Sequence, residues 1–144
     1  MGIFLRKGTT DEILVSINHD SVKDERFARL PGGSIEFGEL SINAFRREMR
    51  EELETEVEDP TYIGFIENVF IYEGEKGHTI DFLYTGKLAR KEIYRMEKVP
   101  AQEPDHRFVM EWVPMQKFLD GELPLYPAYD YLSILGQIPY EVLK

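Results

Sequence analysis

The chain has 144 residues, and 42% of them are hydrophobic, which suits a single domain over residues 1–144 with a sizeable core. It contains no cysteine, so disulfides and thiolate metal sites are excluded. Its formal net charge of -10 disfavours binding to nucleic acid, because nucleic-acid affinity rests on Lys and Arg side chains that neutralise phosphates.

The start of the chain holds two short runs that favour β-strands. These runs are Ile3 to Leu5 and Ile13 to Ile17, and a polar segment containing glycine, Lys7 to Asp11, joins them. This arrangement predicts a hairpin, and we expect the chain to start within its first strand. A charged loop is predicted next, from Asn18 to Arg26.

A Gly-Gly pair, Gly32 and Gly33, follows Pro31. Glycine tolerates positive φ and lets backbone amides approach a phosphate closely, so both glycines are candidate phosphate-binding residues. An isolated Gly-Gly pair is usually only a turn, so this interpretation depends on the residues that follow.

An amphipathic helix is predicted to start at Ser41, a candidate N-cap. Apolar residues then recur at helical spacing, with no Gly or Pro between them: Ile42, Phe45, Met49 and Leu53. At about 3.6 residues per turn, the acidic side chains fall on one arc and the basic ones on the other side. The acidic side chains are Glu48, Glu51 and Glu52, and the basic ones are Arg46, Arg47 and Arg50.

Like charges on one helix face repel each other by about 0.2–0.5 kcal/mol per pair, so the acidic arc favours a bound cation. Mg²⁺ prefers a few carboxylates together with water and substrate phosphate, which fits this set of side chains. The alternative is a solvated charged face on which Arg47 and Glu51 form an i,i+4 ion pair. The helix alone leaves both interpretations open.

After Pro60 the pattern predicts a long antiparallel hairpin. Its strands are Tyr62 to Ile66 continuing through Asn68 to Tyr72, and His78 to Tyr84, with a turn at Glu73 to Gly77. The segment Tyr94 to Arg107 contains two prolines and many charges, which predicts a mobile loop or a short helix with loop flanks.

The last third of the chain is predicted to contain one more strand, Val109 to Val113, and a stiff connector, Leu123 to Pro127. A C-terminal helix is expected from four residues at near-helical spacing: Tyr129, Leu132, Leu135 and Ile138. Strands, a helix, more strands and a closing helix indicate an α/β fold, in which a mixed sheet is covered by helices on both sides.

The spacing of charged residues around the first helix matches a known signature. Five residues separate Gly33 from Glu39, seven separate Glu39 from Arg47, and Glu48, Met49, Glu51 and Glu52 follow. This resembles the Nudix box of the MutT-like Nudix hydrolases. The resemblance covers about Ile3 to Leu135 and implies a Nudix-type α/β/α sandwich.

The resemblance also implies roles for the residues of the box. Glu48, Glu51 and Glu52 would bind Mg²⁺, or alternatively Mn²⁺, with Glu52 and Glu48 as direct ligands. Glu39 would support the metal shell or an activated water, and Arg47 would orient the carboxylates.

The chain departs from the family pattern at Glu54 and Thr55, where the family has a glycine and an apolar residue. In the family that glycine ends the helix in a left-handed turn. Glu54 therefore predicts a longer or differently terminated helix, running toward Pro60.

The general base is drawn from different places in this family, often from a loop before a strand that carries a Glu-Trp pair. Glu103 lies in the predicted loop, and Glu111 precedes Trp112. Each could equally be an ordinary exposed charge. His78 resembles a histidine found after the hairpin turn in several family members, although a structural role explains one unpaired histidine as well.

The resemblance implies a Mg²⁺-dependent pyrophosphohydrolase that cleaves a nucleoside diphosphate linked to another group. The alternatives are a catalytically silent Nudix-like module that binds or senses nucleotides, and an acidic interaction domain. The expected partner is a nucleotide or nucleotide-sugar substrate, and a homodimer is left open. No apolar run reaches the length of a membrane span, and the apolar start is too short for a signal peptide, so we expect a cytoplasmic protein without membrane contact.

Overall fold

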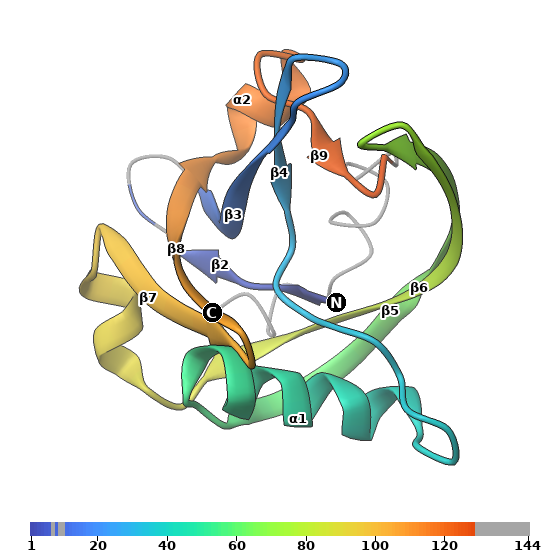
Figure 1. The fold of residues 1–144 in the computed structure, drawn as a ribbon. Helices are drawn as coiled ribbons and strands as arrows, with labels where there is room; N and C mark the ends of the chain where they lie inside the picture. The colour runs from blue at the N-terminus through green and yellow to red at the C-terminus, as the bar shows by residue number, and fades with distance from the viewer. Residues whose placement is uncertain (7, 9–10, 129–144) are drawn as a thin grey trace.

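The computed structural model describes residues 1–6, 8 and 11–128, whose strands form two mixed sheets (Figure 1). The smaller sheet has the order β1-β6-β5, with β1 (Gly2–Ile3), β6 (Glu75–Leu88) and β5 (Val57–Tyr72). Strand β1 runs parallel to β6, and β5 runs antiparallel to it. The long β5–β6 hairpin curves around one side of the molecule in Figure 1.

The larger sheet has the order β7-β8-β3-β4-β9, and β2 pairs with β3 beside this path. Its strands are β2 (Leu5–Arg6), β3 (Glu12–Asp20), β4 (Glu25–Arg29), β7 (Lys98–Glu103), β8 (His106–Pro114) and β9 (Leu125–Tyr126). Strand β9 is parallel to β4, and the other pairs are antiparallel. The chain crosses between the sheets at Phe4, which is fully buried.

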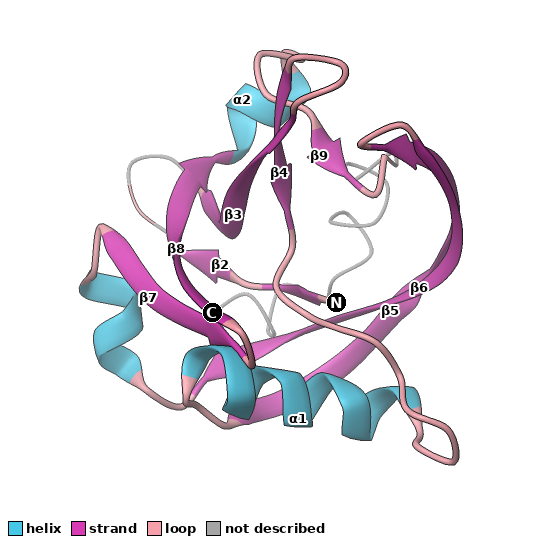
Figure 2. Cartoon of the chain, viewed as in Figure 1, coloured by secondary structure: helices cyan, strands magenta, loops and turns pink. Residues whose placement is uncertain are grey.

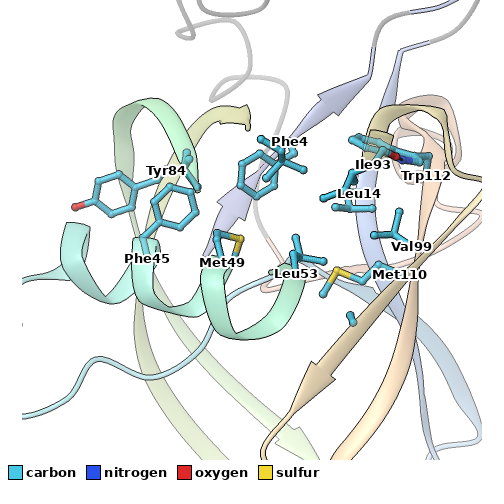
Figure 3. Close-up of a cluster of buried hydrophobic side chains, with 13 residues drawn as sticks. Phe4, Leu14, Phe45, Met49, Leu53, Tyr84, Ile93, Val99, Met110 and Trp112 are labelled. Carbon is cyan, nitrogen blue, oxygen red and sulfur yellow. Dashed lines mark hydrogen bonds between the residues drawn. The ribbon is translucent and has the colours of Figure 1, made fainter. Parts of the chain in front are cut away.

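Three helical segments accompany the sheets: α1 (Ser41–Leu53), the 3₁₀ helix η1 (Lys91–Arg95) and α2 (Met115–Leu119) (Figure 2). Helix α1 packs its apolar face, with Phe45, Met49 and Leu53, into one buried cluster. Figure 3 shows these side chains directed toward Phe4 and Met110. No helix in the described part of the chain is long and apolar enough to cross a membrane.

A second buried cluster joins the two sheets to each other. Its members come from strands of both sheets and from the loop that follows β4: Ile3, Ile13, Val15, Ala28, Leu30, Ile66, Leu83, Val113 and Leu125. The larger sheet is therefore buried on both faces, by α1 on one side and by the smaller sheet on the other. Because both faces of the larger sheet are packed in this way, the ends of β7 and β4 are held in place relative to α1.

The predicted α/β class with mixed β-sheet is confirmed, although the strands divide into two sheets. The predicted β5–β6 hairpin is also confirmed, but its turn is shorter than expected. Glu73 and Gly74 alone form the turn, with φ angles of 50° and 78°, and Tyr72 already pairs with Glu75. Glycine at the second position adopts the positive φ of such a two-residue turn with little steric strain.

The prediction of a loop over Tyr94 to Arg107 is wrong in its second half. Helix η1 accounts for the expected short helix, but β7 and the start of β8 are strands that pair with each other. Pro100 lies within β7, and this is tolerated because β7 is the edge strand of its sheet. Glu103 is consequently the last residue of a strand and does not lie in a mobile loop.

The predicted loop from Asn18 to Arg26 shrinks to a four-residue turn, because β3 continues to Asp20 and β4 begins at Glu25. Leu5 pairs with Ile13, as the predicted N-terminal hairpin requires, although part of its turn lies outside the described residues. The predicted C-terminal helix, beginning near Tyr129, also lies outside them.

Both ends of helix α1 differ from expectation. Leu40 is the N-cap and provides no side-chain cap, whereas the Ser41 hydroxyl hydrogen-bonds to the Tyr84 hydroxyl at 2.7 Å. The helix ends at Leu53 and does not run toward Pro60. Glu54 adopts the left-handed conformation, with φ 51° and ψ 42°, and its N–H donates to the Met49 carbonyl.

Candidate active site

Arg47 is the centre of an ion-pair network on α1. Its Nε and Nη2 donate to the two carboxylate oxygens of Glu39 at 3.0 Å each, and its Nη1 donates to Glu48 at 2.7 Å and to Glu51 at 3.1 Å. Nη2 also donates to the Ser34 carbonyl at 2.9 Å. The expected separation of basic from acidic side chains is thus wrong for Arg47, which lies among the carboxylates.

The network shifts the pKa values of Glu39 and Arg47. The hydrogen bonds from Arg47 lower the pKa of Glu39, and the same bonds raise the pKa of the Arg47 guanidinium. Glu39 and Glu48 each keep only 17% of their side-chain surface exposed, whereas Glu51 keeps 57%. Arg47 therefore holds two shielded carboxylates, Glu39 and Glu48, and one exposed carboxylate, Glu51.

Glu52 is the buried carboxylate of the helix, with 5% of its surface exposed. Its pKa is raised to about 8, chiefly by burial and also by the nearby charges of Glu48 and Glu103. The Gly32 N–H, which donates to Glu52 at 3.0 Å, and the charge of Arg29 act in the opposite direction. A buried carboxyl surrounded by other carboxylates is a strong site for a proton or another cation.

The two glycines of the Gly-Gly pair hold this arrangement together. Gly33 packs so closely on Glu48 that an added Cβ would overlap the Glu48 carboxylate. Gly32 has a φ of 145° and directs its N–H at Glu52. Their contacts within the structure are therefore made with carboxylates, while their predicted contact with a phosphate stays a prediction.

A small polar cavity of about 190 Å³ opens beside Glu52. It is lined by Glu52 from α1, Arg29 from β4, Glu103 from the end of β7 and His106 from the start of β8, among other residues. Glu103 and His106 face each other across a tight turn, with 3.6 Å between Oε2 and Nδ1. The structure thus brings Glu103 together with Glu52, although 51 positions separate them in the sequence.

Glu111 and His78, the other candidates for proton transfer, lie elsewhere. Glu111 sits in the middle of β8, opposite Val15 and Lys98, and does not line the cavity. His78 is exposed on the β5–β6 hairpin, where its Nε2 lies 2.9 Å from Glu67. Neither residue is among those that surround Glu52.

The carboxylates on α1 have the oxygen donors that Mg²⁺ prefers. In the conformation described, however, no three acidic or histidine side chains of the described residues are close enough together to hold a metal ion. Glu48 and Glu51 are held by Arg47, and Glu52 by Gly32. The donor chemistry fits Mg²⁺, and the charges of Glu48 and Glu103, which raise the pKa of Glu52, would favour a cation beside it.

A larger cavity of about 570 Å³ adjoins the small one. Arg29 is the one residue, of those described, that lines both. Four aromatic side chains contribute to the larger cavity: Phe27, Phe70, Tyr72 and Tyr126. Phe27 makes edge contacts with Tyr72 and Tyr126, at centroid distances of 5.9 and 5.3 Å.

Arg29 and His106 were not singled out by the sequence analysis. Arg29 stands two residues before Pro31, and His106 stands three residues after Glu103, yet neither belongs to a motif. A cation directly before the Gly-Gly turn was the available signal for Arg29. The place of His106 depends on the β7–β8 turn, which the sequence analysis interpreted as a loop.

Comparison with known proteins supports the same assignment of the fold. A search of curated proteins gave no match. A search of solved structures found the solution structure of the E. coli ORF135 protein, with a TM-score of 0.52 and 22% sequence identity, covering 96% of this chain and 89% of that one. The family model of the NUDIX domain matches residues 1–132. Because this match takes in nearly the whole chain, the protein belongs to the Nudix family.

Proposed function

We propose that the protein is a Mg²⁺-dependent pyrophosphohydrolase that cleaves nucleoside diphosphate derivatives, such as nucleotides and nucleotide sugars. The observation that carries this proposal is the buried Glu52, with a pKa of about 8, in a polar cavity shared with Glu103 and Arg29. A carboxyl group in a cavity whose pKa is strongly raised is a candidate for a functional site, and a bound cation would offset its charge. Membership of the Nudix family supports hydrolysis of a phosphoric anhydride as the reaction.

In this proposal Glu48, Glu51 and Glu52 would hold the metal ion, which would supply positive charge to neutralise the diphosphate. Arg47 and Glu39 keep Glu48 and Glu51 in position through the contacts described above. Arg47 donates to one carboxylate oxygen of Glu48 and one of Glu51, so the second oxygen of each could bind the metal ion. Arg47 is thus a positioning residue.

Glu103 is the proposed general base. Its carboxylate lines the cavity beside Glu52 and is 53% exposed, so a water molecule can reach it. It would take the proton from the water whose oxygen attacks phosphorus, while the bridging oxygen leaves with the other phosphoryl group. His106 lies beside it, with 3.6 Å between Nδ1 and the Glu103 Oε2, which is too far for a hydrogen bond in this conformation.

The alternative is a module that binds nucleotides without cleaving them. Such a module has no need of a full set of carboxylates, yet Glu39, Glu48, Glu51, Glu52 and Glu103 are all present. The shared cavity of Glu52 and Glu103 favours the hydrolase, because binding a nucleotide does not require a free carboxylate near the metal ligands.

The test is a screen of the purified full chain against nucleoside diphosphates, triphosphates and nucleotide sugars with Mg²⁺, compared with Glu52→Gln. We expect phosphate or nucleoside monophosphate release by the wild type, with a loss of several orders of magnitude in Glu52→Gln. Calorimetry should show Mg²⁺ binding that Glu52→Gln weakens. Binding of a nucleotide without turnover would favour the sensing module, and equal Mg²⁺ affinity in both proteins would contradict the metal site.

A further inference from the structure

Among the residues that the structure describes, Arg29 is a cation without an ion-pair partner, in a strongly acidic protein. It is exposed at the end of β4, and its guanidinium makes no hydrogen bond or ion pair with any other described residue. By contrast, Arg47 is bound to three carboxylates. The chain has a net charge of -10, and Arg29 lies near Glu52 with its guanidinium donors unpaired among the described residues. Such a guanidinium can bind an anionic group.

The position of Arg29 is defined by the two cavities. The small one contains the carboxylates of the proposed reaction site, and the large one contains the aromatic side chains. Because Arg29 lines both, this residue lies between the two cavities. A substrate that occupied both cavities would pass this point.

The lining of the large cavity favours an uncharged, flat group. Its volume of about 570 Å³ is within the range of small-molecule sites, and aromatic side chains can stack on a planar ring. Three acidic residues line it, Asp20, Glu25 and Asp81, against the two cationic side chains of Lys23 and Arg29, so the lining has no net positive charge to attract further phosphates. A diphosphate therefore fits the small cavity and the junction, and a base fits the large one.

We propose that Arg29 binds a phosphoryl group of the substrate and so directs the attached aromatic base into the large cavity. A guanidinium can form two parallel hydrogen bonds with phosphate oxygens, which fixes orientation as well as adding affinity. Arg29 is a binding and orienting residue, and it deepens the proposed function because it rests on a diphosphate as the substrate.

The chain supplies a matched control in Arg26. It lies on the same strand, is exposed like Arg29 and lines neither cavity. Arg29→Gln and Arg26→Gln therefore remove the same charge from the same strand. Arg29→Lys keeps the charge but loses the paired hydrogen bonds.

The probes are inorganic pyrophosphate with Mg²⁺, measured by calorimetry, and the best substrate of the screen, measured by steady-state kinetics. We expect Arg29→Gln to weaken pyrophosphate binding and to raise KM by about 10-fold or more, with kcat changed much less. Arg29→Lys should recover part of the loss, and Arg26→Gln should stay within about twofold of the wild type. Circular dichroism and thermal melts establish that each variant is folded.

Equal effects of Arg29→Gln and Arg26→Gln would overturn the inference, because the loss would then be a general effect of charge. The absence of measurable pyrophosphate binding to the wild type would overturn it as well. If the wild type hydrolyses its substrate and Arg29→Gln behaves like the wild type, the inference fails and the hydrolase stands. If pyrophosphate binding depends on Arg29 but nothing is hydrolysed, the proposed function fails and the inference stands.

Discussion

Glu52 is the carboxylate whose ionisation the fold changes most. Its pKa rises to about 8 from an ordinary value of 4.5, chiefly through burial. Between these values the folded protein keeps a proton that the unfolded chain releases, so the stability of the folded state falls as the pH rises. Between these two pKa values, each pH unit lowers the free energy of unfolding by about 1.4 kcal/mol while no metal is bound.

Replacing Glu52 by Gln should therefore stabilise the metal-free protein at neutral pH. We expect Glu52→Gln to unfold in urea with up to about 3 kcal/mol more free energy than the wild type at pH 7, with the difference vanishing near pH 4. Glu51→Gln, at an exposed position of the same helix, is the control and should change stability little. Identical pH profiles for wild type and Glu52→Gln would show that Glu52 ionises normally.

The two candidates for the general base, Glu103 and Glu111, have different surroundings. Because Glu103 shares the small cavity with Glu52 and Glu111 does not line it, Glu103→Gln should lower kcat by about 10²–10⁴-fold. Glu111→Gln should leave kcat within about threefold. Steady-state kinetics on the best substrate with Mg²⁺ measures both. The opposite result would assign the base to Glu111, and no loss in either variant would direct the search to Glu39.

At the scale of the element, helix α1 ends in a conformation that suits glycine better than glutamate. Glu54 is left-handed, with φ 51°, so it takes the shape that glycine adopts in the family pattern. The prediction of a longer helix was wrong because the chain makes the left-handed turn at Glu54 even though this residue is not a glycine. The backbone of Glu54 donates to Met49, and its carboxylate lies 3.9 Å from Arg90.

This makes a direct comparison of two substitutions informative. Glu54→Gly and Glu54→Ala both lose the contact with Arg90. Only alanine still has a Cβ, which is sterically strained in the left-handed conformation. We expect Glu54→Gly to be more stable than Glu54→Ala by roughly 0.5–1 kcal/mol in urea unfolding. Equal unfolding midpoints would mean that this turn changes its conformation in the variants.

At the scale of the whole molecule, the two sheets are joined at their far end by a polar contact. Asp20, 1% exposed, accepts N–H bonds from Val22 and Lys23 at 3.0 Å and from Glu73 at 3.2 Å. Glu73 in turn accepts from the backbone N–H of Ser21 at 2.6 Å. The β3–β4 turn and the tip of the β5–β6 hairpin are thus held together beside the large cavity.

Asp20→Asn should lower the melting temperature at pH 7, because an amide offers one acceptor oxygen where the carboxylate offers two. Asp24→Asn, in the same turn with 93% of its side chain exposed, should change it little. These N–H bonds, that of Lys23 first, lower the pKa of Asp20 from 3.8. The stabilisation is therefore present above this value and lost as the pH falls through the lowered pKa, so the two melting curves should converge in strong acid. A deficit that persists there would contradict the assignment.

The sequence by itself determined helix α1, its apolar face and the order of its carboxylates, because a helix is a local structure whose period can be read from neighbouring residues. It also determined the β5–β6 hairpin and the family, through the spacing of Gly33, Glu39 and Arg47. Strand β7 was missed because Pro100 within it and Pro104 directly after it mimic a loop, and only pairing with β8 makes it a strand.

The tertiary structure alone decided which residues meet. Glu103 and Arg29 come from different strands of the larger sheet, and Glu52 comes from the helix packed against that sheet. The burial that raises the pKa of Glu52 is likewise a property of the assembled surfaces, since the exclusion of water depends on every element around the side chain. Spacing along a chain carries no information about such contacts, so the small cavity and the free guanidinium beside it became visible only in the folded molecule.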